Sequence, residues 1–96
     1  MKIDFTKNDN KILINLEGRL DTITSPELET FINNNIKGVN AIEIDCGKLT
    51  YISSAGLRIL LSTHKRMSGA LTLTNVCELV MEVFEITGFI DVLTIK

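Results

Sequence analysis

The sequence has few of the residues on which catalysis, metal binding and nucleic-acid binding depend. Its 96 residues contain no tryptophan, one histidine, two cysteines and one proline, and aromatic residues make up 5%. Ten Lys and Arg against twelve Asp and Glu give a net charge of -2. Because no dense basic run is present, nucleic acid is not expected as a partner. Cys46 and Cys77 are isolated and are expected to be small buried hydrophobes, not a disulfide or a metal site.

Long apolar runs are also missing. The N-terminus lacks the stretch of a signal peptide, and the apolar runs elsewhere are too short to cross a bilayer. We therefore expect a cytoplasmic protein with no membrane partner. Hydrophobic residues make up 45% of the chain, which is enough for one core. Residues 1–96 are expected to form a single domain.

The usual catalytic arrangements are not visible. His64 shares a helical stripe with Leu57, Leu60 and Leu61, and it is expected to be a packed, hydrogen-bonded core residue and not a general base. The glycines form neither of the usual phosphate-binding loops, and the aspartates lie in different predicted elements. We therefore expect no enzyme, no metal and no cofactor.

The order of the predicted elements indicates an α/β fold. Strands are predicted at 3–5, 11–16, 41–46, 70–74 and 89–95, with a hairpin turn at 7–10 between the first two. Three helices are predicted between the later strands. This alternation favours a mixed, mostly parallel sheet of about five strands with right-handed crossovers.

Capping signals place the ends of the predicted helices. The first is expected to be capped by Ser25, followed by Pro26, or by a capping box formed by Thr24 and Glu27. The second is predicted to span 54–67. The third is expected to begin with a capping box of Asn75 and Glu78 and to end at Gly88.

The segment from Leu49 to Leu57 joins the third predicted strand to the second predicted helix. Its small residues, Ser53, Ser54, Ala55 and Gly56, would let another molecule approach the backbone. Ser54 is expected at the helix cap or in the first turn, where free N–H groups and the helix dipole favour an anion such as a phosphate. A serine in this place is, however, usually an ordinary cap.

This segment resembles the signature of the STAS domain family (sulphate transporter and anti-sigma factor antagonist), in which a strand leads through an apolar-Asp-Ser-Ser-Gly-Leu motif into the second helix. Three further segments agree in order and spacing. Gly18–Asp21 resembles the family's Gly-x-Leu-Asp, Ile42–Asp45 resembles its third strand, and Ile86–Phe89 resembles the end of its third helix. The resemblance covers nearly the whole chain.

For a chain of this length the resemblance implies a stand-alone anti-sigma factor antagonist. Such a protein captures an anti-sigma factor with serine kinase activity, is released when it is phosphorylated, and is reset by a serine phosphatase. Carried over by position, the phosphorylated residue is Ser54. Ser53 stands where the family motif has Asp and is the alternative site. The phosphate of Ser54 is expected to meet backbone donors, whereas Ser53 should point elsewhere.

The resemblance also implies a partner-binding surface around the second helix. Arg58 and Ser62 follow Ser54 by about one and two helical turns and would extend the same exposed face. Arg58 is equally consistent with an ordinary solvated charge. The expected partner-binding residues are Asp21, Ser53, Ser54, Ala55, Gly56, Arg58 and Ser62.

A second function remains open. The chain also resembles constitutive STAS-domain subunits of transport or signalling assemblies, such as a lipid-trafficking ABC transporter, in which the same helix face would dock permanently. In addition, the chain ends directly after its last predicted strand, whereas many family members continue into a further helix. Weak self-association at that sheet edge is therefore also open.

Overall fold

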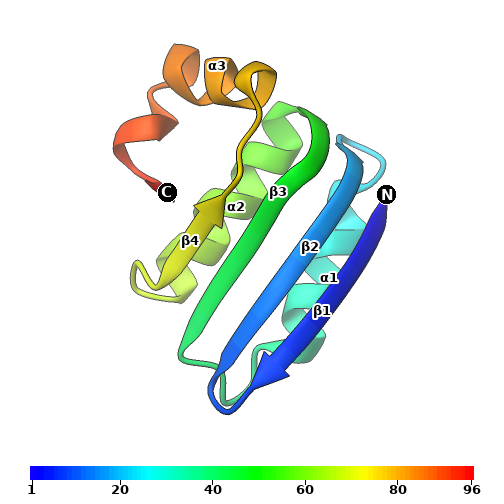
Figure 1. Ribbon diagram of the computed structural model, residues 1–96, viewed down its shortest axis with the longest axis vertical. Coiled ribbons are helices and arrows are strands. Elements are labelled where there is room, and N and C mark those ends of the chain that lie inside the picture. The colour runs from blue at the N-terminus through cyan, green and yellow to red at the C-terminus, as the bar shows by residue number, and fades with distance from the viewer.

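The computed structural model describes residues 1–96 as one five-stranded sheet with three helices (Figure 1). The predicted α/β class, with three helices and a mixed sheet, is confirmed. The strands are β1 (Lys2–Asn8), β2 (Lys11–Leu20), β3 (Ala41–Ile52), β4 (Leu71–Thr74) and β5 (Thr94–Ile95). The helices are α1 (Ser25–Asn35), α2 (Ser54–Arg66) and α3 (Glu78–Thr87), and a short 3-10 helix, η1 (Phe89–Asp91), follows α3.

The strands lie side by side in the order of the sequence. β1 and β2 are antiparallel, and β2, β3, β4 and β5 are parallel to one another. The predicted hairpin turn is confirmed, because Asn8 pairs with Lys11 and only Asp9 and Asn10 connect the strands. Asp9 adopts a φ of 51°, which aspartate tolerates better than most residues.

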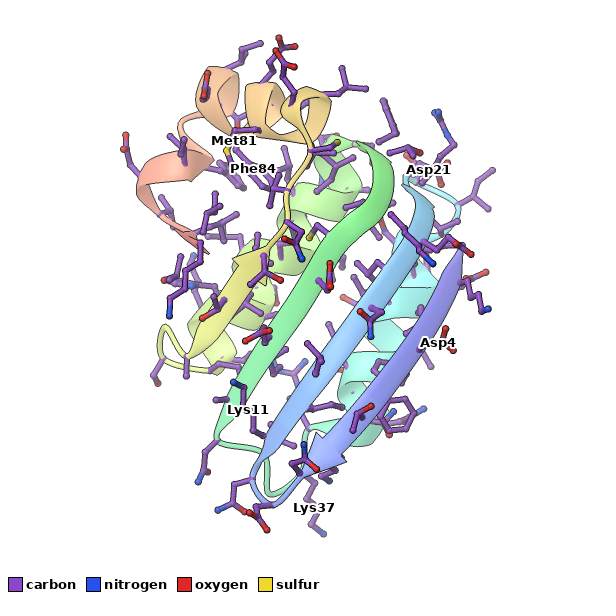
Figure 2. The ribbon with its side chains drawn as sticks, viewed as in Figure 1. Asp4, Lys11, Asp21, Lys37, Met81 and Phe84 are labelled. Carbon is purple, nitrogen blue, oxygen red and sulfur yellow. The ribbon has the colours of Figure 1, made fainter.

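The two faces of the sheet differ in character. Alternate residues of β2, such as Ile12, Ile14 and Leu16, are buried under α1 and α2, which cover one face (Figure 1). Their neighbours Lys11, Asn15 and Glu17 are exposed on the other, open face. α3 lies beyond the end of β4 and buries Val80 and Phe84 (Figure 2). The core is therefore a single layer between the sheet and α1 and α2, extended at one end by α3.

The last predicted strand is largely wrong. Instead of a strand over 89–95, the chain forms η1 and then the two-residue strand β5. Gly88 ends α3 with a left-handed φ of 80°, and the N–H groups of Val92 and Leu93 both donate to the carbonyl of Phe89. The apolar residues of this segment do not alternate, because the chain must turn back toward β4 before it can pair.

Two predicted helix caps are also wrong. The hydroxyl of Thr24, the N-cap of α1, donates to the carbonyl of Arg19 and caps nothing, while Ser25 is buried without a partner for its hydroxyl. Asn75 has a φ of 56°, and its amide donates to the Asp45 carboxylate on β3. Cys77 is the N-cap of α3 and makes no side-chain cap bond. The side chain of Thr24 is thus taken by the turn before the helix, and that of Asn75 by a tertiary contact with β3.

The predictions for Cys46 and His64 had different outcomes. Cys46 is buried, as predicted, and this burial raises the pKa of its thiol to about 12. His64 is half-buried on α2, and its Nδ1 has no hydrogen-bond partner. The expectation of a hydrogen-bonded His64 was therefore wrong, because no acceptor or donor from a neighbouring element reaches that nitrogen.

Candidate functional site

The residues singled out from the sequence lie where β2 and β3 end. Leu20 and Ile52 are paired across the two parallel strands. Asp21 and Ser53, which follow them in the sequence, therefore leave neighbouring strands at the same edge of the sheet. The N–H of Ser53 donates to the carbonyl of Leu20 at 2.9 Å. This bond joins the start of α2 to the turn that follows β2. The segments Gly18–Asp21 and Leu49–Leu57, which were singled out from the sequence, therefore lie side by side.

Asp21 holds that turn in place. Its Oδ1 accepts from the N–H groups of Thr24 and Ile23, each at 3.0 Å, and its side chain is 25% exposed. The hydrogen bond from the backbone of Thr24 is the main reason why the pKa of the Asp21 carboxyl lies below its ordinary value. Asp21 is thus a charged acceptor built into the turn, with its other oxygen facing Arg19 at 3.7 Å.

Arg19 is fixed beside this turn. Its guanidinium carbon lies 4.1 Å from the centre of the Tyr51 ring, a distance at which the ring face attracts a cation. Together with the contact to Asp21, this gives the Arg19 side chain, which is 61% exposed, two contacts at the surface. The surface next to α2 therefore carries a cation and an anion whose positions are both set by the strand ends.

The same turn exposes an apolar residue that the sequence reasoning missed. Ile23 is 83% exposed, although its N–H is held by Asp21. Ile23 is one of several exposed apolar side chains, and it is held in a turn that lies beside the start of α2. No periodic pattern includes Ile23, so nothing in the sequence distinguished it from a core residue.

Ser54 is exposed and is the first residue of α2, as predicted. Ser53 is the N-cap, and its hydroxyl accepts from the N–H of Gly56 at 3.4 Å. The expectation that Ser53 points elsewhere was therefore wrong, because the extended backbone of an N-cap turns its side chain toward the first turn. The N–H groups of Ser54 and Ala55 have no acceptor within the protein.

The small residues after the serines have different roles. A Cβ added to Gly56 would lie 2.8 Å from Cγ of Leu20, 2.9 Å from Cγ1 of Ile52 and 2.9 Å from the Leu20 carbonyl oxygen. Gly56 is itself buried. Its size is thus explained by the close packing of α2 on the strand ends. Ala55 is half-buried beside it.

Beyond the first turn, the outer face of α2 carries Arg58 and Ser62. Both are exposed, as predicted. They line a shallow hollow with Leu61, Lys65 and Arg66. A larger hollow, of about 420 Å³, lies on the open face of the sheet and is lined by charged and amide side chains, including Asp4, Asp45 and Asn75. The predicted site residues line only the first of these hollows.

The structure contains neither a candidate metal-binding cluster nor a helix that could span a membrane. No three side chains of His, Cys, Asp or Glu are grouped so that they could hold a metal ion. No helix combines the length and the apolar character needed to span a bilayer. The candidate site is the surface formed by Ser54, the Asp21 turn and the outer face of α2.

Comparison with known proteins gives a consistent result. The model of the family described as STAS domain matches residues 2–96. The Bordetella bronchiseptica protein BtrV, provisionally named an anti-sigma factor antagonist, is 35% identical over 96 residues, which cover 96% of this chain and 83% of BtrV. The anti-sigma-B factor antagonist of Bacillus subtilis is 29% identical, covering 100% of this chain and 91% of the relative.

Solved structures agree on the fold. The unphosphorylated form of the anti-sigma factor antagonist SpoIIAA superposes with a TM-score of 0.83 at 19% identity, covering 99% of this chain and 88% of the other. The phosphorylated form of SpoIIAA from Bacillus superposes with a TM-score of 0.75 at 19% identity, covering 99% and 91%. The arrangement of strands and helices around Ser54 is therefore shared with these proteins.

Proposed function

Since this chain belongs to the STAS domain family, we propose that it is an anti-sigma factor antagonist that is switched by phosphorylation of Ser54. In its unmodified form it binds an anti-sigma factor with serine kinase activity through Asp21, Ser53, Ser54, Ala55, Arg58 and Ser62. Gly56, which was also expected to contact the partner, is buried and acts only by letting α2 pack closely on the strand ends. A phosphate on Ser54 ends this binding, and a serine phosphatase restores it. The protein acts by binding and carries out no chemistry of its own.

One observation carries this proposal: Ser54 is exposed at the start of a helix whose first turn contains no acidic residue. The first turns of α1 and α3 contain Glu27 and Glu78, which is the usual way to complement the helix dipole. In α2 that place is empty, and the N–H groups of Ser54 and Ala55 are free to meet an anion. A phosphate on Ser54 would fill the place without disturbing the fold.

The same phosphate would oppose binding. It adds about -1.5 to -2 charges at neutral pH, on an exposed serine at the same strand ends as the turn that carries the exposed Ile23. A partner that covers Ile23 and Ser54 would have to remove water from this charge. Release follows because the helix stabilises the phosphate in the free protein, whereas the interface does not.

Ser54 is favoured over Ser53 for a physical reason. The hydroxyl of Ser53 already accepts from the N–H of Gly56, and Ser53 is half-buried. Phosphorylation of Ser53 would replace this cap, whereas phosphorylation of Ser54 leaves it in place. A kinase would thus reach Ser54 without first opening the helix.

The proposal is tested by incubating the protein with its cognate kinase and ATP and mapping the product by fragmentation mass spectrometry. We expect phosphate on Ser54 in the wild type and in Ser53→Ala, and none in Ser54→Ala. Phosphate on Ser53 alone would move the switch to that residue. If a kinase that binds the protein modifies neither serine, the protein is instead a constitutive STAS-domain subunit of a larger assembly.

A further inference from the structure

The outer face of α2 is basic, although the protein as a whole is not. Arg58, Lys65 and Arg66 are exposed and line one shallow hollow with Leu61 and Ser62. The 13 residues of α2 include no Asp or Glu, while the net charge of the chain is -2. The positive charge of this face is therefore a local feature and does not follow from overall composition.

These cations have no carboxylate partner within the protein. The four ion pairs engage Lys2, Lys11, Arg19 and Lys48. Arg66 donates a hydrogen bond to the side-chain oxygen of Asn33 on α1, which fixes the guanidinium without neutralising it. Most cations along the sheet are paired, whereas those of α2 stay available to a charge from outside.

Helix stability explains only part of this arrangement. Lys65 and Arg66 lie in the last turn of α2, where the helix dipole favours a cation. Arg58 is the fifth residue of the helix, near the opposite end, where the dipole does not favour one. The charge of Arg58 is thus left without a role in folding.

We propose that the outer face of α2 docks an acidic segment of a partner protein, and that a phosphate on Ser54 withdraws Arg58 from it. Ser54 and Arg58 are four residues apart on one exposed helix face, with the anion on the N-terminal side, which is the favourable order for such a pair. A phosphoserine and an arginine form strong charge-assisted hydrogen bonds. This inference rests on the proposed function, because it describes how the same site distinguishes the two states.

An acidic protein segment fits this face better than other anions. Three cations are few for a nucleic-acid site, which neutralises many backbone phosphates, and the hollow includes Leu61, which suits an apolar side chain beside the acidic ones. A second copy of this chain also offers exposed acidic residues, such as Glu78, Glu82 and Glu85 of α3. That possibility is decided by the same experiment.

The experiment is an amide NMR titration of the ¹⁵N-labelled protein with a hexaglutamate peptide at low ionic strength. We expect shift changes concentrated at Arg58, Ser62 and Lys65. Arg58→Glu should weaken binding at least about threefold more than Lys37→Glu, a control that changes the charge equally. Lys37 lies at the opposite end of the sheet from Asp21 (Figure 2) and has no ion-pair partner in the protein.

The phosphate step is tested without any kinase by encoding phosphoserine at position 54 during translation. We expect the modified protein to bind hexaglutamate more weakly, and its ³¹P titration to show a phosphate pKa below the usual value of about 6. Arg58→Gln should raise that pKa, whereas Lys65→Gln should not. An unchanged phosphate titration in Arg58→Gln would overturn the pairing.

Three results would overturn the docking inference. Shift changes spread evenly over all exposed lysines would mean that the face is not distinct. Equal binding of hexathymidylate would mean that any polyanion is accepted. Concentration-dependent shifts of α2 and α3 in the free protein would assign the face to a second copy. Because none of these measurements involves the kinase, failure to phosphorylate Ser54 would sink the proposed function alone.

Discussion

Gly56 is the glycine at which the fold least tolerates a larger side chain. A Cβ at this position would meet Leu20 and Ile52 at 2.8 and 2.9 Å, closer than real Cβ contacts allow. Packing therefore explains why the motif has glycine at position 56. Its neighbours Ser54 and Arg58 are exposed and have no such explanation.

We predict that Gly56→Ala destabilises the protein. Alanine in a helix is normally worth about 1 kcal/mol more than glycine, but overpacking at a rigid contact costs about 1–3 kcal/mol, so the net change should be a loss. Urea unfolding measures it, with Ser62→Ala, at an exposed position of the same helix, as the control. A Gly56→Ala protein at least as stable as the wild type would mean that α2 can move away from the strands.

Asp21 should make stability depend on pH. Hydrogen bonds from the Thr24 and Ile23 backbone lower the pKa of its carboxyl below the ordinary value of 3.8. A group with a lowered pKa in the folded state adds stability above its unfolded value, and this stability is lost as the pH falls through the folded value. The unfolding midpoint of the wild type should therefore fall more between neutral pH and pH 3 than that of Asp21→Asn.

The direct check on Asp21 is a carboxyl ¹³C titration. Its chemical shift should follow an apparent pKa below 3.8. A carboxyl that titrates at or above that value would show that the turn is open in solution. In that case the hydrogen bond from the Ile23 N–H to Asp21 would not hold Ile23 in its exposed position.

Some residues of the site could be predicted from the sequence and others could not. Ser54 could be placed because its position depends on a local signal, small residues at the start of an amphipathic segment. Ile23 and the role of Asp21 could not, because both depend on a turn closed by side-chain bonds to the backbone. Such bonds leave no periodic trace in the sequence.

At the scale of elements, long amphipathic segments were predicted well. α2 was expected over 54–67 and spans 54–66, because its apolar stripe repeats with the helical period. β5 was not predicted correctly, since the apolar run after Gly88 is partly a turn that covers the core. Caps were unreliable for a related reason: Asn75 contacts β3 and not its own helix.

The start of α2 yields a test that separates structure from regulation. Ser53→Ala removes the N-cap bond to Gly56 and should cost about 0.5–2 kcal/mol of stability, near the lower end because the bond is 3.4 Å long. Ser54→Ala removes no bond within the protein and should stay within about 0.5 kcal/mol of the wild type.

Denaturant unfolding of the two variants side by side checks this difference. If Ser54→Ala were the more damaging change, Ser54 would be a structural residue. The loss of a partner in any Ser54 variant would then carry no regulatory meaning.

At the scale of the whole molecule, the alternation of strands and helices was enough to predict the class of fold. The site was predicted from the small residues of the segment 49–57 and from the resemblance, and it lies where the chain leaves two parallel strands, an edge at which α/β proteins usually bind their ligands. The sequence could not show that α1 and α2 leave one face of the sheet open (Figure 1). With right-handed crossovers, this follows from strands that are added in one direction across the sheet, and local patterns do not record that order.

The proposed switch requires no change in the fold. The phosphate changes charge at one edge, and the core between the sheet and its two helices keeps its packing. Unmodified and modified proteins should therefore differ in affinity and not in structure. This separates the switch from one that works by unfolding a segment.

The most direct measurement is a calorimetric titration of the anti-sigma factor kinase with the protein carrying either serine or encoded phosphoserine at position 54, with thermal unfolding recorded for both forms. We predict that phosphoserine weakens binding at least about tenfold, or about 1.4 kcal/mol, at an unchanged unfolding midpoint. Equal affinity of the two forms, or a loss of affinity that accompanies earlier unfolding, would contradict the account.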